Sequence, residues 1–143
     1  MTLIDSIKLH EGFRSRVYKC SNGFDTIGYG AAIKDLELDE DIAEMILLRQ
    51  VQKIEIRIVN TFDWYEDTPE QIQDVIVEMC FQIGVSGFGK FKKTISYAKN
   101  KDYKSMSVEM LDSKWARSDS PQRAKELSEK VSKIVNIKDR QDD

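Results

Sequence analysis

The chain has 143 residues, of which 41% are hydrophobic and 33% are charged, and its formal net charge is −3. This length and apolar content suit one compact domain with a buried core and argue against a largely disordered chain. Cys20 and Cys80 are too few for a disulfide framework, and no residue cluster has zinc-like spacing, so we expect neither a metal nor a cofactor. Residues 1–5 contain an acid and no apolar run is long enough to span a bilayer, so we expect no signal peptide and no stable membrane insertion.

The first residues carry a helix-start pattern. Thr2 can act as the N-cap and Asp5 as the acid of a capping box, so we expect a helix from Leu3. Gly12 is the kind of residue that ends a helix, which puts Glu11 at the helix C-terminus. The negative end of the helix dipole disfavours another negative charge, so this position suits a carboxyl group that donates a proton.

A β-hairpin is predicted next. Two strand-like runs, 17–20 and 24–27, flank an Asn-Gly pair, which is a strong hairpin signal. A three-residue turn makes Cys20 and Thr26 cross-strand neighbours on one face, whereas a two-residue turn pairs Cys20 with Asp25. The pattern alone leaves both registers open, and with them a role for Asp25 as a carboxylate beside Cys20.

A long helix is predicted over residues 39–60. Its apolar face consists of residues at helical spacing, namely Ile42, Ile46, Leu47, Val51, Ile54 and Ile58. At roughly 1.5 Å per residue, such a helix is long enough to bridge two lobes. Residues 61–67 form the turn after it.

The next helix is predicted from the capping pattern around Pro69. Thr68 is the expected N-cap, Pro69 the first helical residue, and Gln71 the partner that completes a capping-box variant. Gly84 is expected to end this helix. Its predicted core residues are Ile72, Val75, Ile76, Met79 and Ile83. A final amphipathic helix is expected to start at Pro121.

These elements predict an α+β protein that is mainly α-helical. We expect a single domain over residues 1–143, with a small N-terminal lobe of helix and β-hairpin or short sheet (1–38), a connecting helix (39–60) and a helical C-terminal lobe (61–143). A cleft is expected between the lobes.

Charge is unevenly distributed along the chain. Residues 1–86 hold 8 basic and 16 acidic side chains, whereas residues 87–136 hold 12 basic and 6 acidic ones. The densest basic stretch contains Lys90, Lys92, Lys93, Lys99, Lys101 and Lys104. These lysines either form a solvated surface or steer an anionic ligand. Nucleic acid is not the expected partner, because no glycine-rich or aromatic recognition motif accompanies them.

One constellation points to chemistry. Eight residues separate Glu11 from Cys20 and five separate Cys20 from Thr26, and Thr26 opens the run Thr-Ile-Gly-Tyr-Gly that ends at Gly30. This spacing resembles the Glu-(eight)-Asp/Cys-(five)-Thr pattern of phage-type lysozymes, or endolysins. The resemblance implies a lysozyme-like fold in which Glu11 is the general acid and Cys20 and Thr26 position or activate water. Cys20 stands where an Asp is commoner, so it either assists a water molecule or attacks the sugar as a thiolate.

Two later segments resemble the same family. Glu78–Gly84 is similar to its Asn-Met-Val-Phe-Gln-Met-Gly segment, which implies that Phe81 and Gln82 line the sugar cleft. The run from Ser113 through Ala124 is similar to the family's Ser-Arg-Trp-(four)-Pro-Asn-Arg-Ala stretch. The residues that this resemblance assigns to substrate binding are Phe81, Gln82, Lys114, Trp115, Arg123 and Gly30. From the residues alone, Trp115 is equally a core anchor, and Arg123 is either a surface cation or the partner of Glu11.

The resemblance implies a muramidase. Such an enzyme hydrolyses the β-1,4 bond between N-acetylmuramic acid and N-acetylglucosamine in bacterial peptidoglycan and lyses the host cell. It implies a monomer, made in the host cytoplasm, that reaches the cell wall with the help of a holin. Two alternatives remain, namely a lytic transglycosylase acting on the same bond and a peptidoglycan-binding protein that has lost catalysis.

Overall fold

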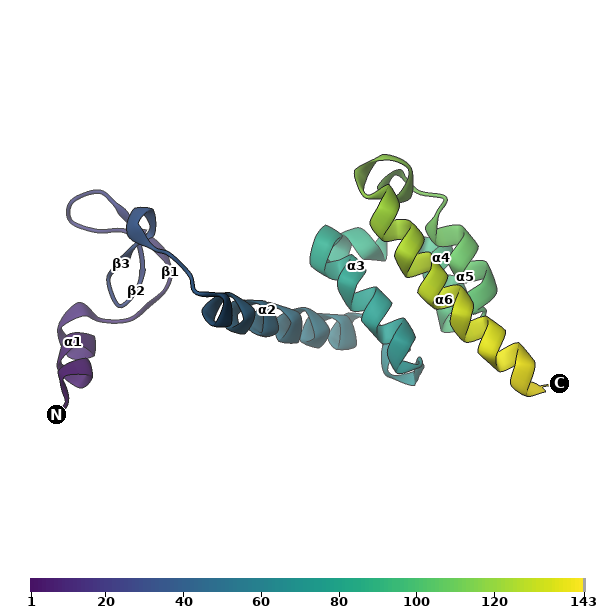
Figure 1. The fold of residues 1–143 in the computed structure, drawn as a ribbon, viewed down its shortest axis with the longest axis horizontal. Coiled ribbons are helices and arrows are strands. Elements are labelled where there is room, and N and C mark those ends of the chain that lie inside the picture. The colour runs from purple at the N-terminus through teal and green to yellow at the C-terminus, as the bar shows by residue number, and fades with distance from the viewer. Residues whose placement is uncertain (143) are drawn as a thin grey trace. The chain divides into compact units, whose positions relative to one another are not determined.

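The computed structural model describes the backbone of residues 1–142 and the side chains of residues 1–134. The chain divides into two compact units, Met1–Met45 and Ile46–Asp143, and the boundary lies within helix α2 (Figure 1). Helices predominate, and a small antiparallel sheet lies near the N-terminus. The predicted α+β, mainly helical class is confirmed.

Helix α1 (Leu3–Glu11) has the predicted capping box. The hydroxyl of Thr2 accepts a hydrogen bond from the Asp5 N–H, and the Asp5 carboxylate accepts one from the Thr2 N–H. Gly12 ends the helix at φ 72° and ψ 153°, and its N–H donates to the carbonyl of Lys8. Glu11 is therefore the last residue of the helix, as predicted.

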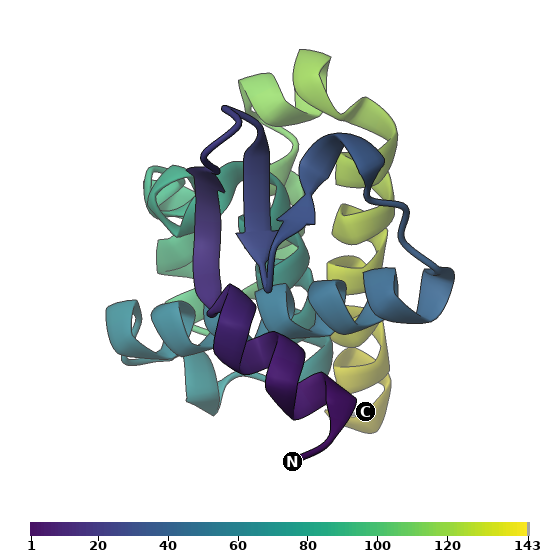
Figure 2. The same cartoon turned by 90° about the vertical axis from the view of Figure 1, so that its left-hand side faces the viewer.

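The sheet of the N-terminal unit contains β1 (Arg14–Lys19), β2 (Asp25–Gly28) and β3 (Ala31–Ala32). All pairings are antiparallel, and β2 lies in the middle (Figure 2). The third strand is an addition to the predicted hairpin. The register of the β1–β2 ladder shifts between Arg14 and Tyr18.

The turn between β1 and β2 selects one of the two predicted registers. Cys20 donates its N–H to the carbonyl of Phe24, so the loop consists of the three residues 21–23. Tyr18 lies opposite Thr26, and Lys19 lies opposite Asp25. Because alternate residues share a face, Cys20 and Thr26 lie diagonally on the same face. The alternative prediction of a two-residue turn, which would pair Cys20 with Asp25, is wrong.

Helix α2 (Glu40–Thr61) and a 3₁₀ turn (Tyr65–Asp67) precede α3 (Glu70–Gly89). Ile58, near the C-terminal end of α2, is the only fully buried residue of this helix. The predicted apolar face of α2 therefore contributes to the core through its C-terminal end.

The predicted cap of α3 is wrong. The hydroxyl of Thr68 donates to the Tyr65 carbonyl at 2.6 Å, so it closes the preceding turn, and Pro69 occupies the N-cap position without a side-chain hydrogen bond. Gln71 accordingly completes no capping box.

Gly84 breaks α3 rather than ending it. Its φ of 81° and ψ of 158° are non-helical, and helical structure resumes beyond it as far as Gly89. This region of backbone conformation is essentially restricted to glycine. The predicted helix end at Gly84 is therefore an interruption of α3, and the helical segment after it was not predicted.

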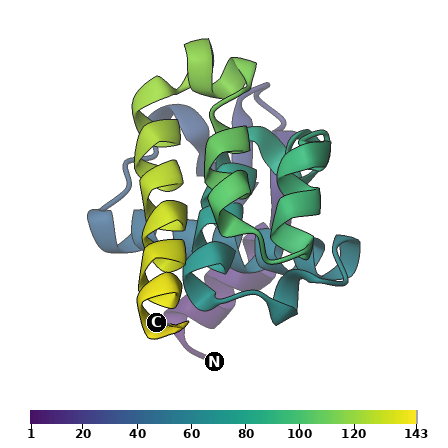
Figure 3. The ribbon, with the colours of Figure 1, turned by 90° about the vertical axis from the view of Figure 1, so that its right-hand side faces the viewer.

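The C-terminal unit continues with α4 (Lys92–Lys99), α5 (Tyr103–Met110), a π-helical turn (Trp115–Asp119) and α6 (Pro121–Asp142). Helix α5 packs against both α4 and α6 (Figure 3). Among the described side chains, the buried apolar residues all lie between Ile58 and Val131 and form one cluster. Four of the five core residues predicted for α3 are buried in this cluster, and Ile83 is partly buried against it.

Candidate active site

Glu11 packs against a glycine turn of the N-terminal unit. Gly30 has a φ of 89°, and a Cβ atom built on it would lie 2.9 Å from Oε2 of Glu11. Any side chain at this position would collide with the carboxyl group. Gly30 therefore lets the Glu11 carboxyl lie directly against the backbone between β2 and β3.

Cys20 and Thr26 form the second part of the candidate site. Backbone hydrogen bonds at Phe24 and Asn22, together with the neighbouring Thr26 hydroxyl, lower the pKa of the Cys20 thiol below its ordinary value. The Thr26 side chain is buried, and its hydroxyl donates to the Phe24 carbonyl at 3.0 Å. This orientation leaves the lone pairs of the hydroxyl oxygen free to accept a hydrogen bond.

Asp25 lies on the other face of the sheet. It pairs directly with Lys19, and its carboxylate accepts a 2.8 Å hydrogen bond from the Lys19 ammonium. Neighbouring residues of a strand point to opposite faces, so Asp25 does not stand beside Cys20. The predicted role of Asp25 as a carboxylate beside Cys20 is therefore wrong, because it required the two-residue turn.

The β2–β3 ladder relates Thr26 to the Glu11 contact. Thr26 pairs with Ala32 and Ile27 with Ala31, so the turn closes at Gly28 and Gly30. Thr26 therefore lies two residues before Gly28, on the strand that leads into the turn contacted by Glu11.

Phe81 and Arg123 line one hollow in the C-terminal unit. The hollow has a volume of about 410 Å³, and α2, α3 and α6 all contribute to its wall. Nε of Arg123 lies 3.5 Å from a carboxylate oxygen of Glu78, one turn before Phe81 and Gln82 in the helix. Arg123 is thus part of an ion pair within its own unit. The pairing with Glu78 was missed because 44 residues separate the two and no local pattern links them.

Gln82 and Trp115 form a hydrogen-bonded pair. The indole N–H of Trp115 donates to the side-chain oxygen of Gln82 at 2.9 Å, and the amide nitrogen of Gln82 donates to the hydroxyl of Ser120. Trp115 is only 3% exposed. It has the position of a core anchor, the first of its two predicted roles. Gln82 itself is exposed, with both ends of its amide held by the segment around the π-helical turn.

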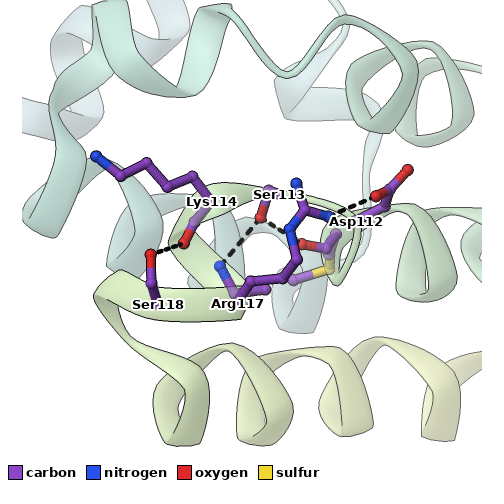
Figure 4. A network of polar contacts seen from close by, with 7 residues as sticks. Asp112, Ser113, Lys114, Arg117 and Ser118 are labelled. Carbon is purple, nitrogen blue, oxygen red and sulfur yellow. Dashed lines mark hydrogen bonds and ion pairs between the residues drawn. The ribbon is translucent and has the colours of Figure 1, made fainter.

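Lys114 immediately precedes that turn, and Figure 4 shows its surroundings. Its carbonyl accepts a hydrogen bond from the hydroxyl of Ser118 at 3.1 Å, whereas its side chain is exposed. Nearby, the Arg117 guanidinium donates to Asp112 at 2.6 Å, and the hydroxyl of Ser113 accepts from the Ala116 N–H. The turn is therefore held by its own polar side chains, and the Lys114 ammonium is presented outward.

Two further findings concern what the described residues contain. In residues 1–134 we find no group of three or more His, Cys, Asp or Glu side chains placed to hold a metal ion. Over the same part of the chain, no helix combines the length and apolar character needed to cross a membrane.

Comparison with protein families identifies a match. Residues 8–133 match the family described as Phage lysozyme, which covers most of the chain and includes every candidate site residue. A comparison with curated proteins finds no match. The fold, the spacing of Glu11, Cys20 and Thr26, and this family match agree, and the chain therefore belongs to the phage lysozyme family of peptidoglycan-cleaving enzymes.

Proposed function

We propose that this protein is an endolysin that hydrolyses the β-1,4 bond between N-acetylmuramic acid and N-acetylglucosamine in peptidoglycan. The observation that carries the proposal is the pairing of an acid and a water-holding hydroxyl on one small scaffold. Glu11 ends α1 against the Gly30 backbone, and Thr26 lies two residues from the same turn. Both groups are fixed by regular structure, which favours a defined reaction geometry.

In this proposal Glu11 donates its proton to the oxygen of the leaving sugar while the bond to the anomeric carbon breaks. A water molecule that donates a hydrogen bond to the Thr26 hydroxyl attacks the opposite face of that carbon. The water releases its proton to the surrounding solvent, and the Cys20 thiol beside it helps to position the attacking molecule. Because the water attacks the face opposite the leaving sugar, the configuration at the anomeric carbon is inverted.

The substrate would be held by the C-terminal unit as well. Phe81 offers an exposed aromatic surface at the rim of the 410 Å³ hollow, and Arg123 offers a guanidinium beside it. Gln82 presents an amide whose orientation is fixed by Trp115 and Ser120. Trp115 then acts through Gln82 rather than by touching sugar. Lys114 provides an exposed positive charge for the anionic wall, and Gly30 acts by making room for Glu11.

The same proposal implies where the protein is made and how it reaches its substrate. The protein would be made in the host cytoplasm, act as a monomer and reach the wall after a holin has opened the inner membrane. These statements rest on the family and on the location of the substrate.

The test is mass spectrometry of the sugar fragments released from purified peptidoglycan. Hydrolysis gives fragments with a reducing muramic acid end. Anhydro-muramic products would instead show that the muramyl 6-hydroxyl attacks, which is the reaction of a lytic transglycosylase. Peptidoglycan that binds the protein without releasing fragments would show a binding protein and overturn the proposal.

A further inference from the structure

Tyr29 lies in the turn that contacts the proposed acid. Strand β2 ends at Gly28 and β3 begins at Ala31, and Gly28 and Gly30 have positive φ angles of 70° and 89°. Glycine adopts such angles without strain, which permits this tight turn. Tyr29 therefore carries the only side chain of the segment 28–30, and any side-chain contact that this segment makes is a contact of Tyr29.

The ring of Tyr29 packs against the chain on both sides of Glu11. The centroid of the Phe13 ring lies 5.5 Å from that of Tyr29, with an angle of 47° between the two planes. Nζ of Lys8 lies 5.5 Å from the Tyr29 centroid. Both distances are within the ranges at which aromatic pairs and cation–π pairs attract each other. All of these residues belong to the unit Met1–Met45.

The two contacts bracket the acid, and the next residue of the turn contacts it. Lys8 lies three residues before Glu11 and Phe13 lies two residues after it. Gly30, the neighbour of Tyr29, is the residue on which a Cβ would lie 2.9 Å from Oε2 of Glu11. The separation between the Gly30 backbone and the carboxyl group therefore depends on how the Tyr29 ring packs.

We propose that Tyr29 is a positioning residue of the active site, a role that rests on the proposed function of Glu11 as the acid. Its ring holds the β2–β3 turn against the end of α1, and Gly30 then limits where the carboxyl group lies. Tyr29 is 44% exposed, so shortening its side chain opens no cavity in a buried core, and variants at this position should still fold.

The first test follows the Gly30 amide signal by NMR from about pH 3 to 7, the range in which carboxyl groups lose their protons. Because the Glu11 carboxyl lies against Gly30, the signal should move with pH in the original chain and lose this movement in Glu11→Gln. Tyr29→Leu removes the aromatic contacts and should reduce the movement by about half or more. Tyr29→Phe keeps the ring and should respond like the original chain.

Phe24 supplies a matched control for this measurement. It is also an exposed aromatic residue with a lysine over its ring, since Nζ of Lys34 lies 3.9 Å from its centroid. It lies at the other end of β2 from the turn at Gly30. Phe24→Leu should therefore leave the pH response of the Gly30 signal unchanged. An equal loss in Phe24→Leu and Tyr29→Leu, or a full response in Tyr29→Leu, would overturn the positioning role.

The second test is the kinetics of hydrolysis of soluble glycan strands. A displaced acid weakens an interaction made in the transition state, so Tyr29→Leu should lower kcat about tenfold with KM within about twofold, and Tyr29→Phe should restore kcat. A raised KM with unchanged kcat would show that the ring contacts the sugar, which would overturn the proposal.

Glu11→Gln, assayed beside these variants, separates this inference from the proposed function. Full activity of Glu11→Gln would overturn the proposed function, and the role of Tyr29 with it. An inactive Glu11→Gln beside a fully active Tyr29→Leu would overturn the role of Tyr29 alone.

Discussion

At the scale of single residues, the most consequential contact is the one between Glu11 and Gly30. A Cβ atom on Gly30 would lie 2.9 Å from Oε2 of Glu11, so the carboxyl group would have to move to make room for it. The orientation of the proposed acid therefore depends on the absence of side-chain atoms at a residue nineteen positions later in the chain. This dependence can be tested, because Gly28 in the same turn offers a matched control.

We predict that Gly30→Ala lowers peptidoglycan turnover by at least tenfold, because the new methyl group displaces the Glu11 carboxyl. Gly28→Ala meets the same backbone strain, at a φ of 70°, but its Cβ contacts nothing within 4 Å. The measurement is turnover of both variants, with thermal unfolding as the check on folding. Equal loss of activity in the two variants would show that backbone strain, and not the Glu11 contact, is responsible.

The two cysteines should differ in reactivity. Turn hydrogen bonds lower the pKa of the Cys20 thiol, whereas burial raises the pKa of Cys80 to about 12. The thiolate fraction of Cys20 should therefore rise at a lower pH than that of N-acetylcysteine amide, and iodoacetamide should modify Cys20 while Cys80 stays unmodified in the folded protein.

Thr26→Val removes a hydroxyl that helps to lower the pKa of Cys20 and should move the midpoint of the Cys20 alkylation profile upward in pH. Peptide mapping by mass spectrometry across a pH series gives both profiles. A Cys20 midpoint at or above that of the model thiol would contradict the role of the turn.

At the scale of elements, glycines decide where helices stop. Gly84 interrupts α3 in a conformation that other residues rarely adopt. We predict that Gly84→Ala destabilises the protein by about 1–2 kcal/mol, measured by urea unfolding. Unchanged stability would mean that the break at Gly84 relaxes into a continuous helix.

The elements also show what the sequence could predict. The capping box of α1 was predictable, because its donors and acceptors lie within four residues of one another. The hairpin register was not, because an Asn-Gly pair suits turns of two and of three residues, and only the Cys20–Phe24 backbone bond decides between them. Thr68 was misassigned as a cap because a threonine hydroxyl can close the preceding turn as readily as it caps the next helix.

The candidate site was predictable to a similar degree. The order of Glu11, Cys20 and Thr26 predicted the family, which the match over residues 8–133 confirms. The catalytic roles of these residues stay predictions. The contact of Gly30 with Glu11 and the pairing of Glu78 with Arg123 depend on how distant segments pack. No pattern within either segment contains that information.

At the scale of the whole molecule, basic and acidic side chains are unevenly distributed along the chain. Residues 87–136 carry 12 basic and 6 acidic side chains, although the whole chain is acidic. We predict that binding to peptidoglycan sacculi weakens by several-fold as sodium chloride rises from about 0.05 to 0.3 M, because salt screens exposed charges. A co-sedimentation assay measures this. Binding that does not respond to salt would remove any role for this basic stretch in attracting the wall.

The central claim is that Glu11 is the acid of a peptidoglycan hydrolase. Its most direct test is the rate of peptidoglycan hydrolysis by Glu11→Gln, with Glu37→Gln as a control that makes the same chemical change elsewhere in the N-terminal unit. We predict a loss of about 100-fold or more in Glu11→Gln, since general acid catalysis contributes on that order, and near-normal turnover in Glu37→Gln. A folded Glu11→Gln variant that turns over within about tenfold of the original chain would contradict the assignment.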